Sequence, residues 1–399
     1  MSLACSSIVD AKRISLSNKE LGLYPARNRI WSQVTVRPGR TAECIQDIYD
    51  EFPHTLSYAT ILTLDSVTTL DYAYIASLVE MMVATSHNLS TLKIWSTPFT
   101  LRDPRFITLL APHFRSIHID DCTFSVLYRV FVLASSKATV WKIGNSRYNR
   151  VAFETSFPHD DGEPVLRQIR EDAAKRGSLP LREFHYRCED ENLLHRYLTS
   201  RADGLTDPLS ILHSPVFRHS ILGRLTDLQV LRVCIRTDCT DELQQLLAAA
   251  AQTMTELKLN TICRASRLKN RPINLKRCIS LTDLELRMTL EDTVGVLRTV
   301  SPGSLNSLQV SLSTLRTLYN SETWKGLYEA LSNPGCLADD HSVVLDFYTW
   351  FDADSIVNES IAVVNGVTAS AKLLSGYACL NVYGLVGTSQ KIVSKVVVQ

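Results

Sequence analysis

The chain has 399 residues, of which 45% are hydrophobic and 21% are charged. These proportions are close to those of globular proteins and exclude a disordered, collagen-like or wholly membrane-embedded chain. Its 42 Lys and Arg residues almost balance its 41 Asp and Glu residues. A net charge of +1 provides no overall attraction to nucleic acid or to a membrane, so neither is an expected partner.

A short phrase of the form LxxLxL recurs along most of the chain. Alternation of apolar and polar residues is typical of a strand with one buried face. The central apolar residues at 231, 257, 284 and 308 are 26, 27 and 24 residues apart, within the usual period of leucine-rich repeats. The clear copies begin at Leu89, Phe114, Leu228, Met254, Leu281 and Leu305, and weaker copies are centred on Val34, Leu62, Trp141, Phe184 and Leu345.

Helices are predicted between several of these strands. Segments 70–83, 164–176, 240–252 and 323–331 place apolar residues at the i, i+3, i+4 spacing of a helix with one buried face. Thr240 is a good N-cap for the third helix. Longer gaps near 143–181, 186–228 and 310–342 predict inserted loops or helices.

Strand and helix alternating at this period predict an α/β fold, an irregular leucine-rich-repeat solenoid of about ten to eleven repeats. Parallel strands would line its concave face and helices would lie outside. The alternative is a doubly wound α/β domain. It is disfavoured because the strands alternate and no glycine-rich phosphate-binding loop occurs.

The N-terminal residues resemble the end of an F-box. Leu3–Val9 is similar to the first half of its closing phrase and Tyr24–Val36 to the second half, with Asp10–Leu23 as an insertion. The degenerate repeats, with Cys122 at the ninth position of one copy, add to this resemblance. Together they resemble the F-box/leucine-rich-repeat proteins of mushroom-forming (basidiomycete-type) fungi, with a truncated F-box.

The resemblance implies a non-catalytic receptor that recognises a protein substrate for ubiquitination by a cullin ligase. The F-box helices that contact the Skp-type adaptor are missing from the pattern, so docking to that adaptor depends on whether residues 3–36 suffice. The resemblance divides the chain into an F-box remnant or cap (1–30), the repeats (31–350) and a C-terminal cap or disordered tail (351–399). The alternative is a repeat scaffold or sensor without a ligase link. Either would act in the cytoplasm or the nucleus.

Catalytic and metal-binding motifs are missing from the sequence. It has no nucleophile elbow and no HExxH motif, so we expect no enzyme and no cofactor, and an enzyme built on an inserted loop such as 144–180 is disfavoured. The clusters 159–161 and 339–341 are interpreted as solvated turns and not as metal sites. Ten scattered cysteines without a CxxC pair predict buried free thiols.

The candidate binding residues lie on the predicted concave face. In each LxxLxL phrase, the residue between the last two apolar positions points to that face. From 93 to 258 all six such residues are basic, whereas Glu285, Gln309 and Asp346 follow. These six basic residues form a stripe on the concave face. An acidic or phosphorylated protein is therefore the predicted partner, unless nearby acidic residues neutralise the stripe. The predicted partner-binding residues are Lys93, Trp95, His118, Lys142, His185, Arg187, Arg232 and Lys258.

Overall fold

The computed structural model describes seventeen segments of the chain: 32–37, 57–66, 72–96, 98–99, 113–120, 122–124, 137–144, 147–148, 180–186, 222, 224–236, 240–262, 273–314, 321–331, 336–350, 378–386 and 389–398. It divides into two compact units. Unit 1 comprises residues 1–181 and 206–221, and unit 2 comprises residues 182–205 and 222–399. Each unit is described by itself.

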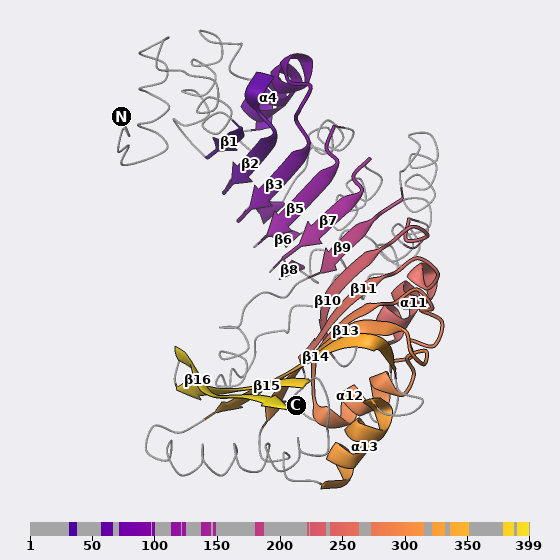
Figure 1. Cartoon of the computed structure of the whole chain (residues 1–399). Coiled ribbons are helices and arrows are strands. Elements are labelled where there is room, and N and C mark those ends of the chain that lie inside the picture. Colours follow the sequence, from indigo (N-terminus) through magenta and orange to yellow (C-terminus); the bar gives the residue numbers. More distant parts are fainter. Residues whose placement is uncertain are drawn as a thin grey trace, which may run out of the picture. The chain divides into compact units, whose positions relative to one another are not determined.

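Unit 1 contains a sheet of five parallel strands (Figure 1). In spatial order they are β1 (Gln33–Val36), β2 (Ile61–Asp65), β3 (Thr91–Trp95), β5 (Ser116–Asp120) and β7 (Val140–Ile143). The central residues of the repeat phrases lie in one register across them and are at most 2% exposed. This apolar row consists of Val34, Leu62, Leu92, Ile117 and Trp141.

Helix α4 (Tyr72–Thr85) follows β2 and matches the helix predicted at 70–83. It buries the predicted apolar stripe, including Ile75, Val79 and Met82. A second small sheet, which the sequence analysis did not predict, joins β4 (Pro98–Phe99), β6 (Thr123–Phe124) and β8 (Arg147–Tyr148) in parallel. Strands of two residues are too short to produce a hydrophobic period.

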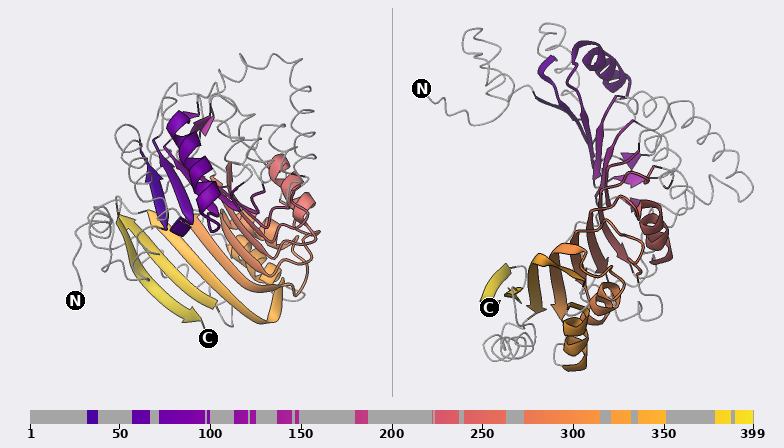
Figure 2. Two further views of the ribbon diagram at one scale, coloured as in Figure 1. Left: turned by 90° about the horizontal axis from the view of Figure 1, so that it is seen from above. Right: turned by 45° about the vertical axis from the view of Figure 1, so that its right-hand side comes forward.

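Unit 2 contains a sheet whose strands are parallel except for the last. Helices α11 (Thr240–Ala250), α12 (Leu290–Leu297) and α13 (Ser321–Leu331) lie on one face of this sheet (Figures 1 and 2). The parallel strands are β9 (Glu183–Tyr186), β10 (Val230–Arg236), β11 (Glu256–Ile262), β12 (Asp283–Met288), β13 (Leu305–Thr314), β14 (Leu337–Trp350) and β15 (Ala378–Val386), and β16 (Ser389–Val398) is antiparallel to β15.

The apolar row of unit 2 follows the predicted repeats up to β13. Phe184, Leu231, Leu257, Leu284 and Leu308 lie in register and are at most 2% exposed. In β14 the predicted centre Leu345 is wrong by two residues, because Leu308 pairs with Val343. The strand carries three consecutive apolar residues (343–345), so alternation alone allows either register. The pairing shifts between Leu305, which lies opposite Leu337, and Ser307, which lies opposite Ser342.

A repeated hydrogen-bond pattern begins the strands. Two successive amides donate to one carbonyl of the preceding repeat, as Thr60 and Ile61 do to Ser32 O at 2.8 and 2.9 Å. The pattern occurs four times in each unit among the described residues. A hydroxyl of the first residue often adds a third bond to the same carbonyl, as in Thr60 and Thr255. Each repeat is thereby fixed one strand spacing from its predecessor.

Cys122 performs the role expected of the ninth repeat position. Its side chain is buried, and its thiol donates to the backbone carbonyl of Ile94 in the preceding repeat at 3.6 Å. It also lies 3.1 Å from the carbonyl oxygen of Asp120. A small weak donor at this position satisfies carbonyl groups where the chain leaves the strand.

The predicted fold class is confirmed: the chain has a leucine-rich-repeat-like α/β fold, with parallel strands in register and helices covering one face. Helix α11 begins at the predicted Thr240. The predicted helix at 164–176 and the F-box remnant at 1–30 lie outside the described residues. Strands β15 and β16 lie within 351–399, and the predicted domain boundaries stay predictions.

Replacing Thr289 tests the stability of α12, a helix that the sequence analysis missed. Thr289 is its N-cap: Oγ1 accepts from the Asp292 amide at 3.2 Å and donates to Asp292 Oδ2 at 2.8 Å. Thr289→Ala should lower the free energy of unfolding by about 1 kcal/mol, because the amide loses its acceptor. Chemical denaturation measures this. Thr289→Ser retains the hydroxyl and is the matched control; an equal loss in both variants would contradict the cap.

Candidate binding face

The predicted binding residues lie on the sheet face opposite the apolar rows, which we call the open face. In unit 1 the row is Thr35, Thr63, Lys93, His118 and Lys142, each in register with the next. In unit 2 the row is His185, Arg232, Lys258, Glu285 and Gln309. The predicted stripe is thus divided between two units, and Arg187 lies outside the described residues.

Ion pairs neutralise the predicted cations of unit 2. Arg232 contacts Glu256 with an Nη2–Oε1 distance of 2.6 Å, and Lys258 contacts Glu285 with an Nζ–Oε1 distance of 2.6 Å. His185 Nε2 lies 3.5 Å from Glu183 Oε2 on the same strand. These pairs are the neutralising alternative that the sequence analysis left open, and they hold for this part of the stripe.

The C-terminal end of the open row differs from the prediction. Gln309 lies opposite Val344, and Asp346 belongs to the next row, opposite Ser311. The Asp346 carboxylate is 3% exposed and accepts a hydrogen bond from Gln309 Nε2 at 2.8 Å. The cause is the same two-residue slip of β14 that moves Leu345 out of its predicted place.

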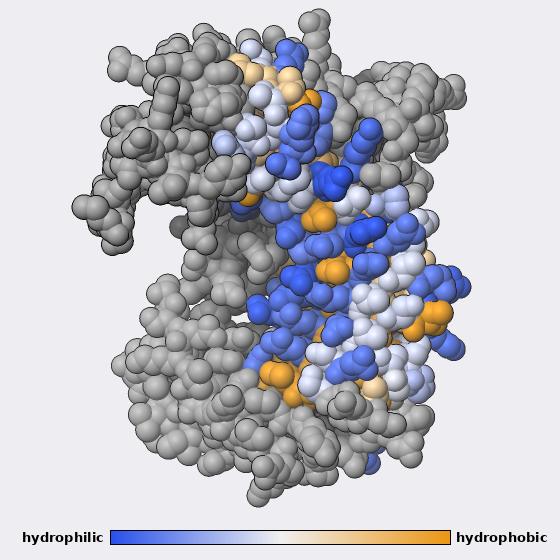
Figure 3. All heavy atoms as spheres, turned by 45° about the horizontal axis from the view of Figure 1, so that its top comes forward, coloured by the Kyte–Doolittle hydropathy of each residue, from blue (hydrophilic) through white to orange (hydrophobic). Residues whose placement is uncertain are grey.

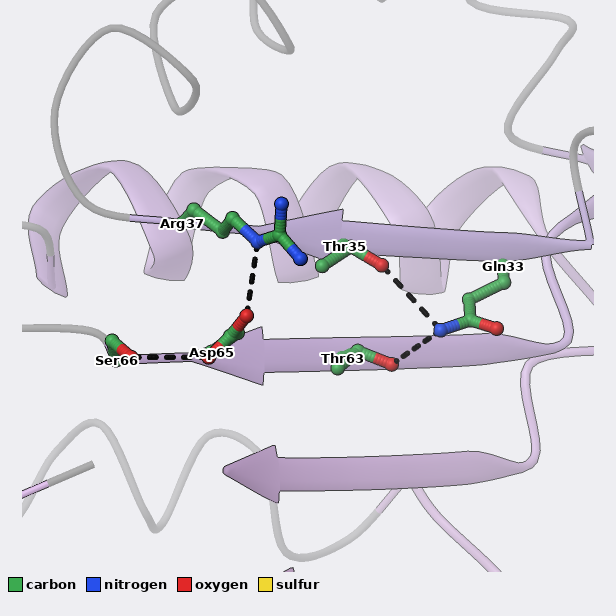
Figure 4. Close-up of polar contacts among 6 residues, drawn as sticks. All are labelled: Gln33, Thr35, Arg37, Thr63, Asp65 and Ser66. Carbon is green, nitrogen blue, oxygen red and sulfur yellow. Dashed lines mark hydrogen bonds and ion pairs between the residues drawn. The ribbon is translucent and has the colours of Figure 1, made fainter. Parts of the chain in front are cut away.

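Polar contacts also link β1 to β2 on the open face of unit 1 (Figure 4). Gln33 Nε2 donates to the hydroxyls of Thr35 and Thr63, at 3.4 and 3.1 Å. One row further, Arg37 Nε pairs with Asp65 Oδ2 at 2.9 Å. Asp65 therefore has a cationic partner just after β1, and no ion pair joins it to Lys93 or Lys142 among the described residues.

The centre of the unit 1 row is Lys93, His118 and Lys142. Neither lysine forms an ion pair with a carboxylate among the described residues. His118 Nε2 shares a 2.9 Å hydrogen bond with Ser116 Oγ. Burial, followed by the charges of Lys142 and Lys93, lowers the pKa of His118 to about 4. At neutral pH the imidazole is therefore uncharged, and the two ammonium groups carry the positive charge.

Trp95 lies in the next row, on the same strand as Lys93. It is 52% exposed, and its indole Nε1 donates to Asp120 Oδ2 at 3.0 Å. Gly144 lies beside that carboxylate: a Cβ built there would come within 2.0 Å of Asp120 Oδ1. The missing side chain leaves room for Asp120 to hold an exposed aromatic ring in a defined orientation.

Among the coloured residues of Figure 3, hydrophilic side chains dominate, and hydrophobic residues are isolated among them. Exposed large hydrophobic residues in the described part of the chain are limited to Trp95 and Ile279. Such a surface favours recognition by charge and hydrogen bonds, with single aromatic anchors, over docking of a broad apolar patch.

Potential metal ligands do not cluster in the described part of the chain. No group of three or more potential metal ligands occurs there. Cluster 159–161 lies outside the described residues, and 339–341, predicted as a turn, is part of strand β14. Cys122, Cys234, Cys278 and Cys336 are buried and form no disulfide, and burial raises the pKa of Cys278 and Cys336 to about 11. No helix in the described segments is long and apolar enough to cross a membrane.

The lowered pKa of His118 makes stability depend on pH. In the unfolded chain its pKa returns to about 6.5, so unfolding takes up a proton between about pH 6.5 and pH 4. The contribution of His118 to stability is present above this interval and is lost as the pH falls through it.

Replacing Lys93 and Lys142 together by Met should raise the pKa of folded His118, since two of its three causes disappear. An NMR titration of the imidazole, assigned with His118→Asn, measures this. Lys276→Met, which removes one exposed charge elsewhere, is the control. If His118 titrates identically in the double variant and the unaltered chain, the lysines do not act on it.

Comparisons with known proteins found likenesses among solved structures alone. No protein-family model matches the chain, and no curated protein matches it. Among solved structures, it is similar to the leucine-rich repeat-containing protein LegL7 from Legionella pneumophila, with 14% sequence identity and a TM-score of 0.36. The similarity covers 88% of this chain and 90% of that one. At this level of similarity, the fold assignment rests on the strand register described above.

Proposed function

We propose that the chain is a non-catalytic repeat scaffold that binds a partner protein through the open face of its sheets. The observation that carries the proposal is the arrangement of polar side chains in register on that face, opposite the buried apolar row. Strands lie about 4.8 Å apart, so a row of such side chains forms a regular array of charges and hydrogen-bonding groups. A repeat sheet of this kind suits extended contact with another protein.

The chemistry of the array supports recognition of a polar partner. Arg232 and Glu256 are 43% and 34% exposed at their side chains, and Lys258 and Glu285 are 27% and 20% exposed. Partly exposed pairs of this kind contribute little to stability but can exchange partners when another charged surface arrives. Trp95 provides an exposed ring of the type common at interface centres.

A finer proposal is that the scaffold is an F-box-like receptor, in the cytoplasm or nucleus, that presents a protein substrate to a cullin-type ubiquitin ligase. Its support is the resemblance of Leu3–Val9 and Tyr24–Val36 to the end of an F-box. The second of these phrases runs directly into β1, the first strand of the unit 1 sheet. The alternative is a scaffold without a ligase link.

Affinity capture with the full chain tests the scaffold proposal. The double variant Lys142→Glu with Arg232→Glu reverses one open-face charge in each unit. It should reduce recovery of the captured partner, measured by quantitative mass spectrometry, by roughly tenfold or more. Lys276→Glu changes an exposed loop residue and should leave recovery unchanged. Equal recovery with all three proteins would show that the partner does not bind the open face.

The same experiment distinguishes the F-box-like receptor proposal from a scaffold without a ligase link. Recovery of a Skp-type adaptor together with the partner, undiminished by the open-face variant, would support the receptor. Recovery of the partner without any adaptor would overturn the receptor and leave the scaffold.

A further inference from the structure

We infer that the open face of unit 1 carries an anion-binding subsite, centred on His118 between Lys93 and Lys142, that takes a phosphorylated side chain of a partner protein. The inference deepens the proposed function by naming the chemistry of one contact. It also restricts the predicted acidic or phosphorylated ligand to one of the two units.

Unpaired positive charge distinguishes this place from the rest of the open face. Lys93 and Lys142 flank His118 in register, and neither has a carboxylate partner among the described residues. Their Cα atoms are two strand spacings apart, on the order of 10 Å. Their long stems can bring both ammonium groups over the imidazole, where a ligand would meet two cations and one ring nitrogen.

Unit 2 provides the contrast within the same molecule. Its equivalent cations, Arg232 and Lys258, are each 2.6 Å from a glutamate oxygen. An anion arriving there must displace a bound carboxylate, whereas at Lys93 and Lys142 it displaces no carboxylate of the described residues. In the sequence, the basic residues of the two units occupy equivalent positions of the repeat. Their pairing differs because the strands next to Arg232 and Lys258 carry glutamates.

A phosphoryl group fits the charge of the subsite. Near neutral pH a phosphorylated side chain carries a charge of about −1.5 to −2, which two ammonium groups balance, while its three oxygens accept several hydrogen bonds. A carboxylate would balance only one of the two lysines. The charged groups that face His118 among the described residues are Lys93 from β3 and Lys142 from β7, with Asp120 on its own strand.

The exposed ring of Trp95 favours a protein-borne phosphate over free phosphate. It lies two residues along β3 from Lys93 and is oriented by its bond to Asp120. An aromatic surface beside a charged subsite can contact the residues that flank a phosphorylated side chain. Free phosphate would make no use of it.

Binding of an anion at this subsite should also raise the pKa of His118. The pKa of unliganded His118 is about 4, and a phosphate group carries a single negative charge in that pH range. That charge opposes the effect of the two lysines and raises the pKa of His118. Occupancy of the subsite therefore has a direct signature in the titration of one side chain.

The first experiment is an NMR titration of His118 in the full chain with inorganic phosphate, against sodium chloride at equal ionic strength. Phosphate should shift the pKa of His118 upward relative to chloride, and Lys93→Met with Lys142→Met should abolish the difference. Identical titrations in the two salts would overturn the subsite.

The second experiment measures retention of the chain on an immobilised phosphoserine peptide library and on its unphosphorylated counterpart. We expect retention on the phosphorylated library only. The Lys93→Met, Lys142→Met variant should lose affinity roughly tenfold or more, because it loses both charged donors. The matched control, Lys276→Met with Arg277→Met, removes two exposed charges from a turn outside the strands of the open face and should retain binding. Lys93→Arg with Lys142→Arg keeps the charges and should also bind.

The two double Met variants decide the interpretation. An equal loss in both would indicate general attraction to a positive protein and overturn the subsite, as would equal retention on the two libraries. Phosphatase treatment separates this inference from the scaffold proposal. A captured partner that survives dephosphorylation with undiminished recovery leaves the scaffold in place and overturns the phosphorylated ligand.

Discussion

Two successive amides that donate to one carbonyl of the preceding repeat hold the repeats in place. This contact fixes where each strand begins relative to its neighbour, as at Ser32 in unit 1 and Gln229 in unit 2. Because side chains alternate between faces, a shift of one residue would send every apolar centre to the wrong side of the sheet. The buried row from Leu231 to Leu308 and the polar row beside it both depend on this start.

The same strand register determines which charged side chains lie next to one another on the open face. Lys258 meets Glu285 because β11 and β12 begin in step, and Lys93, His118 and Lys142 come together for the same reason in unit 1. Burial, followed by the neighbouring charges of Lys142 and Lys93, lowers the pKa of His118 and keeps its imidazole neutral at physiological pH. Unit 1 therefore keeps two positive charges without a described counter-ion, whereas the cations of unit 2 are paired.

Irregularity in the repeats also has a structural role. Gly144 leaves space for the Asp120 carboxylate, which in turn holds Trp95. Ser66 and Ser96 leave β2 and β3 with positive φ angles of 56° and 44°, a conformation more often taken by glycine. These departures from the repeat consensus therefore determine where exposed side chains such as Trp95 are placed.

The sequence by itself determined the fold class, most strand centres and the helix at Thr240, because buried periodicity is a local property. The sequence did not determine the strand register where several apolar residues follow one another, as at 343–345, and it did not reveal strands as short as β4. Only the tertiary structure decided that Arg232 is paired, that Lys142 has no carboxylate partner among the described residues, and that His118 is uncharged. Those properties depend on side chains about 25 residues apart in sequence, which the strand register brings within a few ångströms.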